Sequence, residues 1–314
     1  MVLAQQGSFS SLVNQDVLTD LLADQKSSNT RRTYAKSLKD FFVTIAGVPP
    51  TVALVQEFLS LKQFDAIALV LRYRSILIGR GLSPATINVR LSAVKSLVNY
   101  ARKVGRCEYS LSDVEGLRVQ IYRDTSGVDK EQFRSMLAQL DRTTLKGKRD
   151  YALLRLLWDN ALRRNEISQT NVEDFDGDQG QLWIQGKGSQ QKELVDLSAQ
   201  AVEAINLWMQ TRGEVKRGKP LFITLDRATR GTRLGGNAIY QVVRQLAKSA
   251  GIRKPISPHR IRHSAITAAL DATNGDTRRV QKFSRHVDLN TLTKYDDNRR
   301  QHQKEVTTIL ADLI

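Results

Sequence analysis

The sequence predicts a mainly helical protein of two domains, with one small antiparallel sheet in the second. Apolar residues keep helical spacing through most of residues 11–115, which favours helices there. A polar stretch without a clear period follows at 116–128, and farther on QLWIQGKGSQQKELVDL contains two β-type segments around a glycine-containing turn. We therefore expect a helical domain at 1–115, a linker at 116–128 and a second domain at 129–314.

About four or five helices are expected in the first domain. One covers 11–25, and another begins in SSNTRR and ends at Gly47, where two prolines follow. Ser83 caps a helix whose first residue is Pro84, a position where the missing N–H group costs nothing. The candidate caps for the helices between them are Thr51 and Asp65.

The second domain is expected to begin at Asp129, which forms a capping box with Gln132. Further helices are expected over the apolar stretch 148–160, from the cap Ser198 through Met209, over 237–250, and after the Ser257-Pro258 start. Asp288 is expected to cap a short helix that carries Tyr295. The segment 301–314 has a narrow apolar stripe, so it packs on its own domain or docks on a neighbouring subunit.

The charge of the chain indicates a polyanionic partner. Lys and Arg total 48 against 32 Asp and Glu, which gives a net charge of +16 and a pI near 10.1. Nucleic acid is the commonest such partner, and a merely basic surface is the alternative. The candidates for lining a DNA duplex are polar or basic residues on two helices of the first domain: Thr30, Arg31, Arg32, Lys36, Thr86 and Arg90.

The composition also indicates in which cellular compartment the protein is expected. A single cysteine, Cys107, excludes an internal disulfide and a cysteine-based zinc site. No window approaches the roughly 18 apolar residues that a membrane span needs. The first residues lack the basic start and apolar run of a signal peptide. We therefore expect a cytoplasmic protein in a reducing environment, with no membrane partner.

The residues with the clearest chemistry lie between Ser257 and Tyr295. His259, Arg262 and His263 stand at i, i+3 and i+4 of one helix, so their side chains share a face. Two imidazoles and a guanidinium make a poor core surface and a good site for an oxyanion. Tyr295 follows as a potential nucleophile, although an ordinary half-buried tyrosine is the alternative.

Several motifs, in this order along the chain, resemble the catalytic set of the tyrosine recombinases, the phage integrase family. ALRRNEI is similar to the family's Gly-Leu-Arg-x-Ser-Glu, GKG lies in the predicted hairpin, HRIRH matches His-x-x-Arg-His, and RH precedes the tyrosine. The spacing from His286 to Tyr295 also fits. SSNTRRTYAKSLKDFF and LSPATINVRLSAVKSL resemble the DNA core-binding helices, so the resemblance covers nearly the whole chain.

This resemblance implies a two-domain clamp around double-stranded DNA, and strand cutting and rejoining through a 3′-phosphotyrosyl intermediate without a cofactor, metal or nucleotide. It also implies a dimer at each recombination site and a tetramer in the synapse. No arm-binding domain fits before residue 11, so the chain is similar to the simpler Cre-like, Xer-like and mobile-element recombinases. The implied catalytic residues are Arg163, Lys187, His259, Arg262, His286 and Tyr295. Glu166 and His263 are implied to support them without acting on the substrate.

These residue types suit phosphoryl transfer. Arg163 and Arg262 can each make forked bonds to phosphate oxygens and stabilise the charge that grows on them. Tyr295 ionises near about pH 10 in water, so it needs cationic surroundings to attack at neutral pH. Lys187 is the candidate for protonating the leaving oxygen, and Lys192 on the same hairpin is the alternative.

The sequence departs from the family pattern at a few positions. Ala161 and Arg285 stand where glycine is usual, before Leu-Arg and before His286 respectively, and Asn165 stands where serine is usual. None of these changes removes a catalytic group. Arg285 is expected to add positive charge near Tyr295.

Other functions remain open on the sequence alone. A type IB topoisomerase shares the chemistry, but the first-domain helices and the apolar stripe of 301–314 argue against it. A DNA-binding regulator that never cuts is disfavoured by the complete set of catalytic groups. His259 and His263 have the spacing of a zinc pair, but Arg260 and Arg262 would repel a cation. The sequence does not separate integration, excision and dimer resolution.

Overall fold

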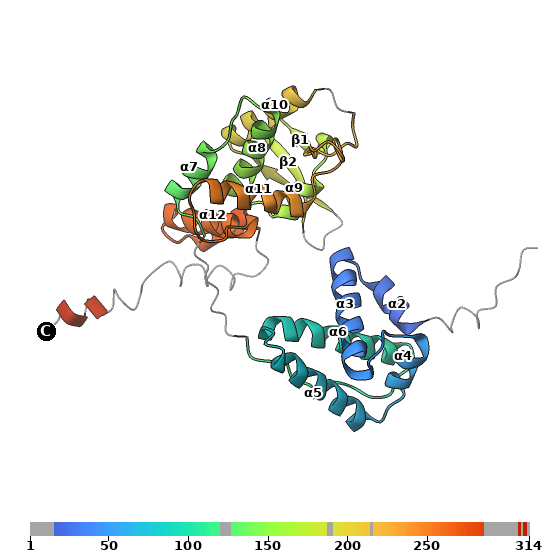
Figure 1. The fold of residues 1–314 in the computed structure, drawn as a ribbon. Coiled ribbons are helices and arrows are strands. Elements are labelled where there is room, and N and C mark those ends of the chain that lie inside the picture. The colour runs from blue at the N-terminus through green and yellow to red at the C-terminus, as the bar shows by residue number, and fades with distance from the viewer. Residues whose placement is uncertain are drawn as a thin grey trace, which may run out of the picture. The chain divides into compact units, whose positions relative to one another are not determined.

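The computed structural model describes residues 16–119, 127–186, 191–213, 216–285, 307–308 and 310–312. The chain divides into two compact units, Met1–Tyr122 and Arg123–Ile314, which are described separately below as the first and the second unit (Figure 1). In the described ranges, no helix is long and apolar enough to cross a membrane.

The first unit is helical. Its elements are α2 (Val17–Asp24), α3 (Ser28–Ala46), α4 (Val52–Leu59), α5 (Gln63–Gly79) and α6 (Pro84–Lys103). The longest helices, α3 and α6, pack against each other, and α2 packs against both (Figure 1).

Side-chain caps explain where most of these helices begin. The hydroxyls of Ser27, Thr51 and Ser83 each accept a bond from the third residue of the helix they precede, so the predicted caps Thr51 and Ser83 are confirmed. Asp65 as a cap is wrong. It lies in the first turn of α5, after an N-cap at Lys62 that makes no side-chain bond. There its carboxylate lies near the positive end of the helix dipole.

Aromatic side chains form the centre of the first core. Phe41 of α3 packs edge-to-face with Phe58 of α4 and Tyr73 of α5, at ring-centroid distances of 5.1 and 5.2 Å. The hydroxyl of the buried Tyr109 donates to the carbonyl of Phe58 at 2.7 Å, so the segment after α6 is also tied to this core.

The second unit is also mainly helical and contains the sheet. Its elements are α7 (Lys130–Ala138), α8 (Leu145–Asp159), α9 (Arg164–Gln169), the 3₁₀ turn η1 (Val172–Asp174), β1 (Phe175–Asp176), β2 (Gln181–Gln185), β3 (Lys192–Asp196), α10 (Ala199–Arg212), α11 (Gly236–Ser249), α12 (Pro258–Ala272) and α13 (Thr277–Ser284). The predicted capping box of Asp129 and Gln132 is confirmed, as are the caps Ser198 and Ser257.

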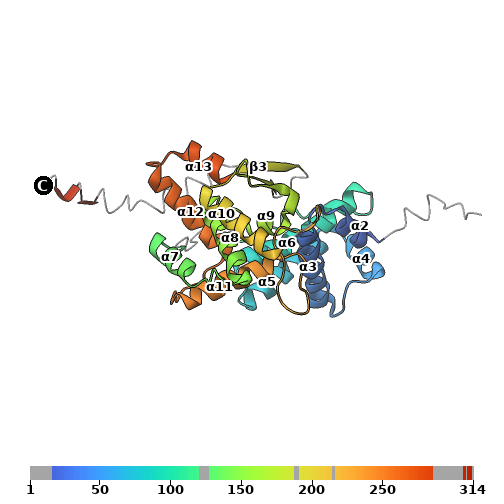
Figure 2. The same cartoon turned by 90° about the horizontal axis from the view of Figure 1, so that it is seen from above.

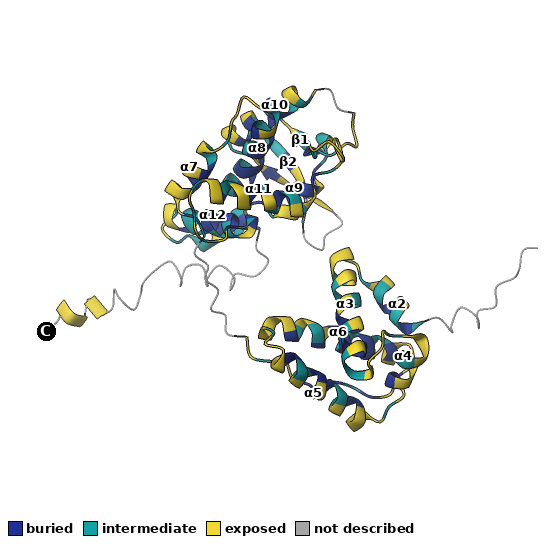
Figure 3. Ribbon diagram, in the orientation of Figure 1, coloured by how far each residue is buried: buried dark blue, intermediate teal, exposed yellow. Residues whose placement is uncertain are grey.

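Helix α8 is the buried centre of the second unit. Its residues Leu153, Leu154, Leu156 and Leu157 are fully buried, and α7, α10, α11 and α12 lie around it (Figure 3). Apolar residues on nearly all its sides explain why the helix is enclosed. It begins at Leu145, three residues before the predicted start, because Thr144 caps it with a bond from Gly147.

The sheet has three antiparallel strands in the order β1-β2-β3, one more than predicted. The pair β2 and β3 follows the expected hairpin, with Leu182 opposite Val195 on the buried face and Trp183 opposite Leu194 on the exposed face. The additional strand, β1, has only two residues, which is too short for an alternating pattern to reveal.

Helices α12 and α13 are neighbours and position the candidate site (Figure 2). Asp276 caps α13, and the helix ends at Arg285 in the left-handed conformation. The sequence analysis did not predict α13 as a helix. The predicted helix capped by Asp288 lies outside the described residues, as does most of the segment 301–314.

Candidate active site

Arg163 lies at the start of α9, held by the carboxylate of Glu166 one turn later. Glu166 Oε2 accepts from the backbone N–H of Arg163 at 2.7 Å, and Oε1 accepts from Arg163 Nη1 at 2.6 Å. Glu166 is 2% exposed, whereas the Arg163 side chain is 31% exposed. The carboxylate is therefore buried, while the guanidinium that it orients remains accessible.

The connection between α8 and α9 is a sharp turn. Ala161 is fully buried and has a φ of 45°, in the left-handed region. The backbone N–H of Leu162 then bonds back to the carbonyl of Leu156 at 3.1 Å, which closes the end of α8. Arg163 therefore follows directly after the buried residues Ala161 and Leu162.

Arg262 is a buried arginine on α12. Its side chain is 1% exposed, and its Nη1 and Nη2 donate to the carbonyl oxygens of Ala161 and Ser284. These acceptors belong to the α8–α9 turn and to the C-terminal end of α13. Free carbonyls at a helix end carry partial negative charge, so a guanidinium there is favoured.

Arg163 reaches the same end of α13. Its Nη2 donates to the carbonyl of Arg285 at 3.4 Å, next to the Ser284 carbonyl that Arg262 contacts. The two arginines predicted to bind one phosphate, which are 99 positions apart in sequence, are therefore brought to adjacent carbonyls.

Arg285 itself adds a third guanidinium. Its Nη2 donates to Glu166 Oε2 at 3.1 Å, and its side chain is 8% exposed. Burial lowers the pKa of the Arg285 guanidinium, and the charge of Glu166 opposes that shift. An arginine pKa lies so high that the group stays charged.

Glu166 is the carboxylate that Arg163 and Arg285 share. Burial alone would raise its pKa, but the charge of Arg285 and the hydrogen bonds from Arg163 outweigh it and hold the pKa below its ordinary value of 4.5. Arg163, Arg262 and Arg285 outnumber Glu166 and Glu193, the carboxylates whose charge acts on Arg285, so positive charge is in excess at the end of α13. Such an excess suits an anion such as a phosphate.

The predicted histidine face of α12 is present. His259 Nε2 and His263 Nε2 are 2.7 Å apart, within hydrogen-bond distance, and the rings meet edge-to-face at 4.2 Å. His259 is exposed and His263 is half-buried, with the buried Arg262 between them in sequence. In this pair one imidazole nitrogen faces the other and can exchange a proton with it.

Lys187, His286 and Tyr295 lie outside the described residues. The alternative lysine, Lys192, is at the start of β3, where its ammonium forms an ion pair with the buried carboxylate of Asp174.

The structure places the first-unit candidates on α3 and α6. Arg31, Arg32, Lys36 and Thr86 are exposed and Thr30 is half-buried. Arg31 Nη2 donates to the carbonyls of Ala23 and Gln25, and the hydroxyl of Thr86 lies 2.9 Å from that of Ser83.

Arg90 differs from the other candidates because it forms an ion pair. Its Nη1 donates to Asp40 Oδ2 at 2.5 Å, and the hydroxyl of the buried Tyr73 donates to the same oxygen at 2.6 Å. The Arg90 side chain is 19% exposed. This cluster links α3, α5 and α6, so Arg90 has a structural role in the fold of the first unit.

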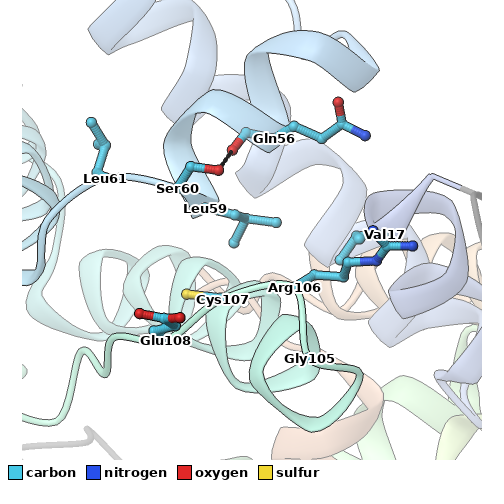
Figure 4. Close-up of a pocket in the computed structure, with 9 residues that line it drawn as sticks. All are labelled: Val17, Gln56, Leu59, Ser60, Leu61, Gly105, Arg106, Cys107 and Glu108. Atoms are coloured by element: carbon cyan, nitrogen blue, oxygen red, sulfur yellow. Dashed lines mark hydrogen bonds between the residues drawn. The ribbon is translucent and has the colours of Figure 1, made fainter.

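A pocket of about 660 Å³ lies in the first unit, far in sequence from the arginine cluster. It is lined by residues of α2 and α4, of the turn after α4 and of the segment after α6, among them Ser60, Arg106, Cys107 and Glu108 (Figure 4). None of the predicted site residues that the structure describes lines it. Burial raises the pKa of the Cys107 thiol, so this group is a poor nucleophile.

The role of Arg285 in the cluster was not predicted. The sequence did contain one indication of this role. Arg285 stands where glycine is usual in the motif, so it adds a charged side chain at that position. Its ion pair with Glu166, 119 positions away, could not be derived from sequence spacing.

The fold and site define a class of protein: a two-unit, mainly helical protein with an arginine- and histidine-rich site suited to a phosphate. Comparison with known proteins agrees. The phage integrase family matches residues 127–302. A tyrosine recombinase of Synechocystis is 59% identical over 96% of both chains, and one of Synechococcus elongatus is 50% identical over 95% of this chain and 94% of its own.

A solved structure shares the fold. The XerH site-specific recombinase bound to its difH substrate aligns over 90% of this chain and 80% of its own, with a TM-score of 0.64 and 20% sequence identity. The family match and the two similar recombinases show that the chain belongs to the phage integrase family and is a site-specific tyrosine recombinase.

Proposed function

We propose that the protein cuts and rejoins DNA strands at specific sites through a 3′-phosphotyrosyl intermediate. Tyr295 attacks the scissile phosphorus, the bond from phosphorus to the 5′ oxygen breaks, and a free 5′-hydroxyl leaves. The ester to tyrosine keeps the bond energy, so a 5′-hydroxyl can attack it in turn and rejoin the strand without a cofactor or nucleotide.

The observation that carries this proposal is the convergence of Arg163 and Arg262 on the end of α13. Both guanidiniums reach neighbouring carbonyls there, and the chain continues from that point to His286 and Tyr295. Fixed cations that surround a phosphate stabilise the charge that develops on it in the transition state. Glu166 and His263 orient Arg163 and His259, respectively.

Lys187 is the proposed general acid for the leaving 5′ oxygen. The alternative, Lys192, is paired with a buried carboxylate, and breaking that pair would leave the charge of Asp174 without its partner. Lys187 stands between two glycines in the segment that joins β2 and β3. His259 and His286 are proposed to bond the phosphate or move protons at it.

We infer that the first unit contributes the core-DNA contacts and that 129–314 is the catalytic domain, with 116–128 as the linker. The exposed Arg32 and Lys36 of α3 support a phosphate-binding role for that helix. We also propose that two protomers bind each site and four form the synapse, and that residues 301–314 join neighbouring protomers. The protein would act in the cytoplasm, where it meets the DNA.

The biological role that we propose is the integration or excision of a mobile element, or the resolution of DNA dimers. Other similar proteins are named tyrosine recombinase XerC, for example one of Neisseria meningitidis that is 29% identical over 88% of this chain. A plasmid carrying two copies of the target sequence tests this role. Deletion of the intervening DNA indicates excision or resolution, and joining of two plasmids indicates integration.

The chemistry is tested by trapping the covalent intermediate. DNA that the protein protects from nuclease digestion is cloned, nicked beside the cleavage position, and incubated with wild type or Tyr295→Phe in EDTA. We expect a protein–DNA adduct on a denaturing gel with wild type and none with Tyr295→Phe, because phenylalanine has no nucleophilic oxygen. An adduct that persists in Tyr295→Phe would contradict the assigned nucleophile, and tight binding without any adduct would favour a regulator.

A further inference from the structure

Arg285 connects three segments of the second unit through one buried guanidinium. Its Nη1 donates to the carbonyls of Asn160 at the end of α8 and Phe283 of α13, at 3.3 and 3.1 Å. Its Nη2 donates to Glu166 of α9 at 3.1 Å. The side chain therefore links the ends of α8 and α13 to the carboxylate that orients Arg163.

The carboxylate of Glu166 is fully engaged. One oxygen accepts from Arg163 Nη1, and the other accepts from the Arg163 backbone and from Arg285 Nη2. With Arg163 as its sole cationic partner, the buried carboxylate would neutralise that guanidinium. Arg285 supplies a second positive charge, so the net charge on the Arg163 side remains positive and available to an anion.

The backbone of Arg285 supports a dedicated role. Its φ of 55° and ψ of 43° lie in the left-handed region, which is unfavourable for a residue with a Cβ. Glycine would adopt this conformation without that cost. An arginine held there against the backbone preference needs compensating interactions, and the bonds to Glu166, Asn160 and Phe283 supply them.

We propose that Arg285 is a positioning residue: it neutralises Glu166 and so holds Arg163 in a fixed orientation with its cationic charge free for the scissile phosphate. This inference rests on the proposed recombinase function. Arg163 keeps 31% of its side chain exposed, so it is accessible to the phosphate, whereas Arg285 is buried and acts through Glu166.

The interaction between Arg285 and Glu166 also predicts how the rate of adduct formation depends on pH. The charged groups that act on Glu166 and Arg285 come from three elements: Arg163 of α9, Arg285 after α13, and Glu193 of β3. Because the charge of Arg285 lowers the pKa of Glu166, its removal raises that pKa. Glu166 would then become protonated, and Arg163 would lose its anchor, at a higher pH than in the wild type.

The test compares Arg285→Asn with Arg279→Asn. Asparagine tolerates the left-handed backbone, so the first variant removes the guanidinium while the turn is kept. Arg279 also lies on α13, is 79% exposed, and gives the same loss of charge away from the cluster. The probe is the nicked duplex made from the DNA that the wild type protects from nuclease.

We expect Arg285→Asn to form the covalent adduct roughly 10- to 100-fold more slowly than wild type, the scale of effect that misplacing a catalytic group produces. Its dissociation constant for the duplex should change less than about twofold, because Arg285 is buried and contacts no phosphate. Arg279→Asn should match the wild-type rate. A wild-type rate for Arg285→Asn would overturn the positioning role.

Glu166→Gln separates positioning from general stability. Arg285→Asn should cost little further rate in a Glu166→Gln background, because the carboxylate that Arg285 neutralises is then absent. The acid side of the rate profile should move to higher pH in Arg285→Asn, and this shifted limb should be absent when Glu166→Gln is added, because no carboxylate then titrates at that position. The proposal would be overturned if the rate losses of Arg285→Asn and Glu166→Gln multiplied in the double variant and the pH profile of the rate did not change.

A measurement on the free protein separates failure of this inference from failure of the proposed function. The ¹⁵N NMR signal of Arg163 Nε–H, assigned with Arg163→Lys, reports how well that guanidinium is held. It should broaden or exchange faster in Arg285→Asn and in Glu166→Gln, but not in Arg279→Asn. An unchanged signal in Arg285→Asn overturns the positioning role, whereas a wild type that forms no adduct contradicts the recombinase chemistry.

Discussion

Ala161 and Arg285 both hold left-handed backbone conformations, with φ of 45° and 55°. They flank the arginine cluster, one before Arg163 and one at the end of α13. Because such conformations are unfavourable for residues with a Cβ, tertiary contacts must maintain them. Ala161 is fully buried against apolar residues of α12 and α13, and Arg285 is held by Glu166.

Glu166→Gln should lower the free energy of unfolding of the second unit at neutral pH by about 1–3 kcal/mol. The folded-state pKa of Glu166 is lowered, so its contribution is present above the ordinary value of 4.5 and is lost as pH falls through the folded-state value. The difference from wild type should therefore shrink in acid. Urea unfolding followed by tryptophan fluorescence measures it, since Trp158, Trp183 and Trp208 all lie in this unit.

Glu131→Gln is the matched control for this measurement. Glu131 also pairs with an arginine one turn away, but both side chains are 75% exposed, so the pair contributes little. Its removal should leave the unfolding midpoint nearly unchanged at every pH. A Glu166→Gln effect of the same size in acid and at neutral pH would contradict the ionised state assigned to Glu166.

At the scale of elements, the start of the second unit is tied to α12, the helix that carries the candidate residues His259 and Arg262. The backbone N–H of Val128 donates to the hydroxyl of Ser264 on α12 at 2.7 Å, and this bond is buried. Gly127 comes so close to α12 that a Cβ on it would lie 1.8 Å from Ser264 Oγ and 2.6 Å from the carbonyl of Arg260. The absence of a side chain at 127 is therefore required for this contact.

Gly127→Ala should destabilise the second unit by about 1–3 kcal/mol, because the added methyl overlaps backbone that cannot move freely. Gly235→Ser is the control, since a Cβ there meets nothing within 4 Å and serine favours the N-cap of α11. Tryptophan fluorescence during urea unfolding measures both variants. Equal midpoints for Gly127→Ala and wild type would show that the start of the unit does not pack on α12 as described.

At the scale of the whole molecule, a net charge of +16 predicts DNA affinity that depends on salt. Arg32→Ala should lower the slope of log affinity against log salt by about one, because the exposed Arg32 is proposed to contact a phosphate. Arg90→Ala should leave the slope unchanged and destabilise the first unit, since Arg90 pairs with Asp40. Fluorescence anisotropy with a labelled duplex measures the slopes, and circular dichroism verifies folding. Equal slopes for Arg32→Ala and wild type would contradict the phosphate contact.

The local signals of the sequence were sufficient for most of the helical fold. Caps such as Thr51, Ser83, Asp129 and Ser257 are specified by residues within one turn, and apolar periodicity marks the buried side of each helix. The two-residue strand β1 and the start of α8 were missed or misplaced, because short pairings and first turns carry little pattern.

The family, the order of the motifs and the helical face of His259, Arg262 and His263 could be predicted from the sequence, because residue type and short spacing specify these features. Which groups meet at the end of α13 followed only from how the helices pack. Arg262 contacts Ala161 and Ser284, and Arg285 pairs with Glu166; in the first unit Arg90 pairs with Asp40. The physical reason is that these partners are far apart in the chain, so packing of the helices, and no local preference, brings their charges together.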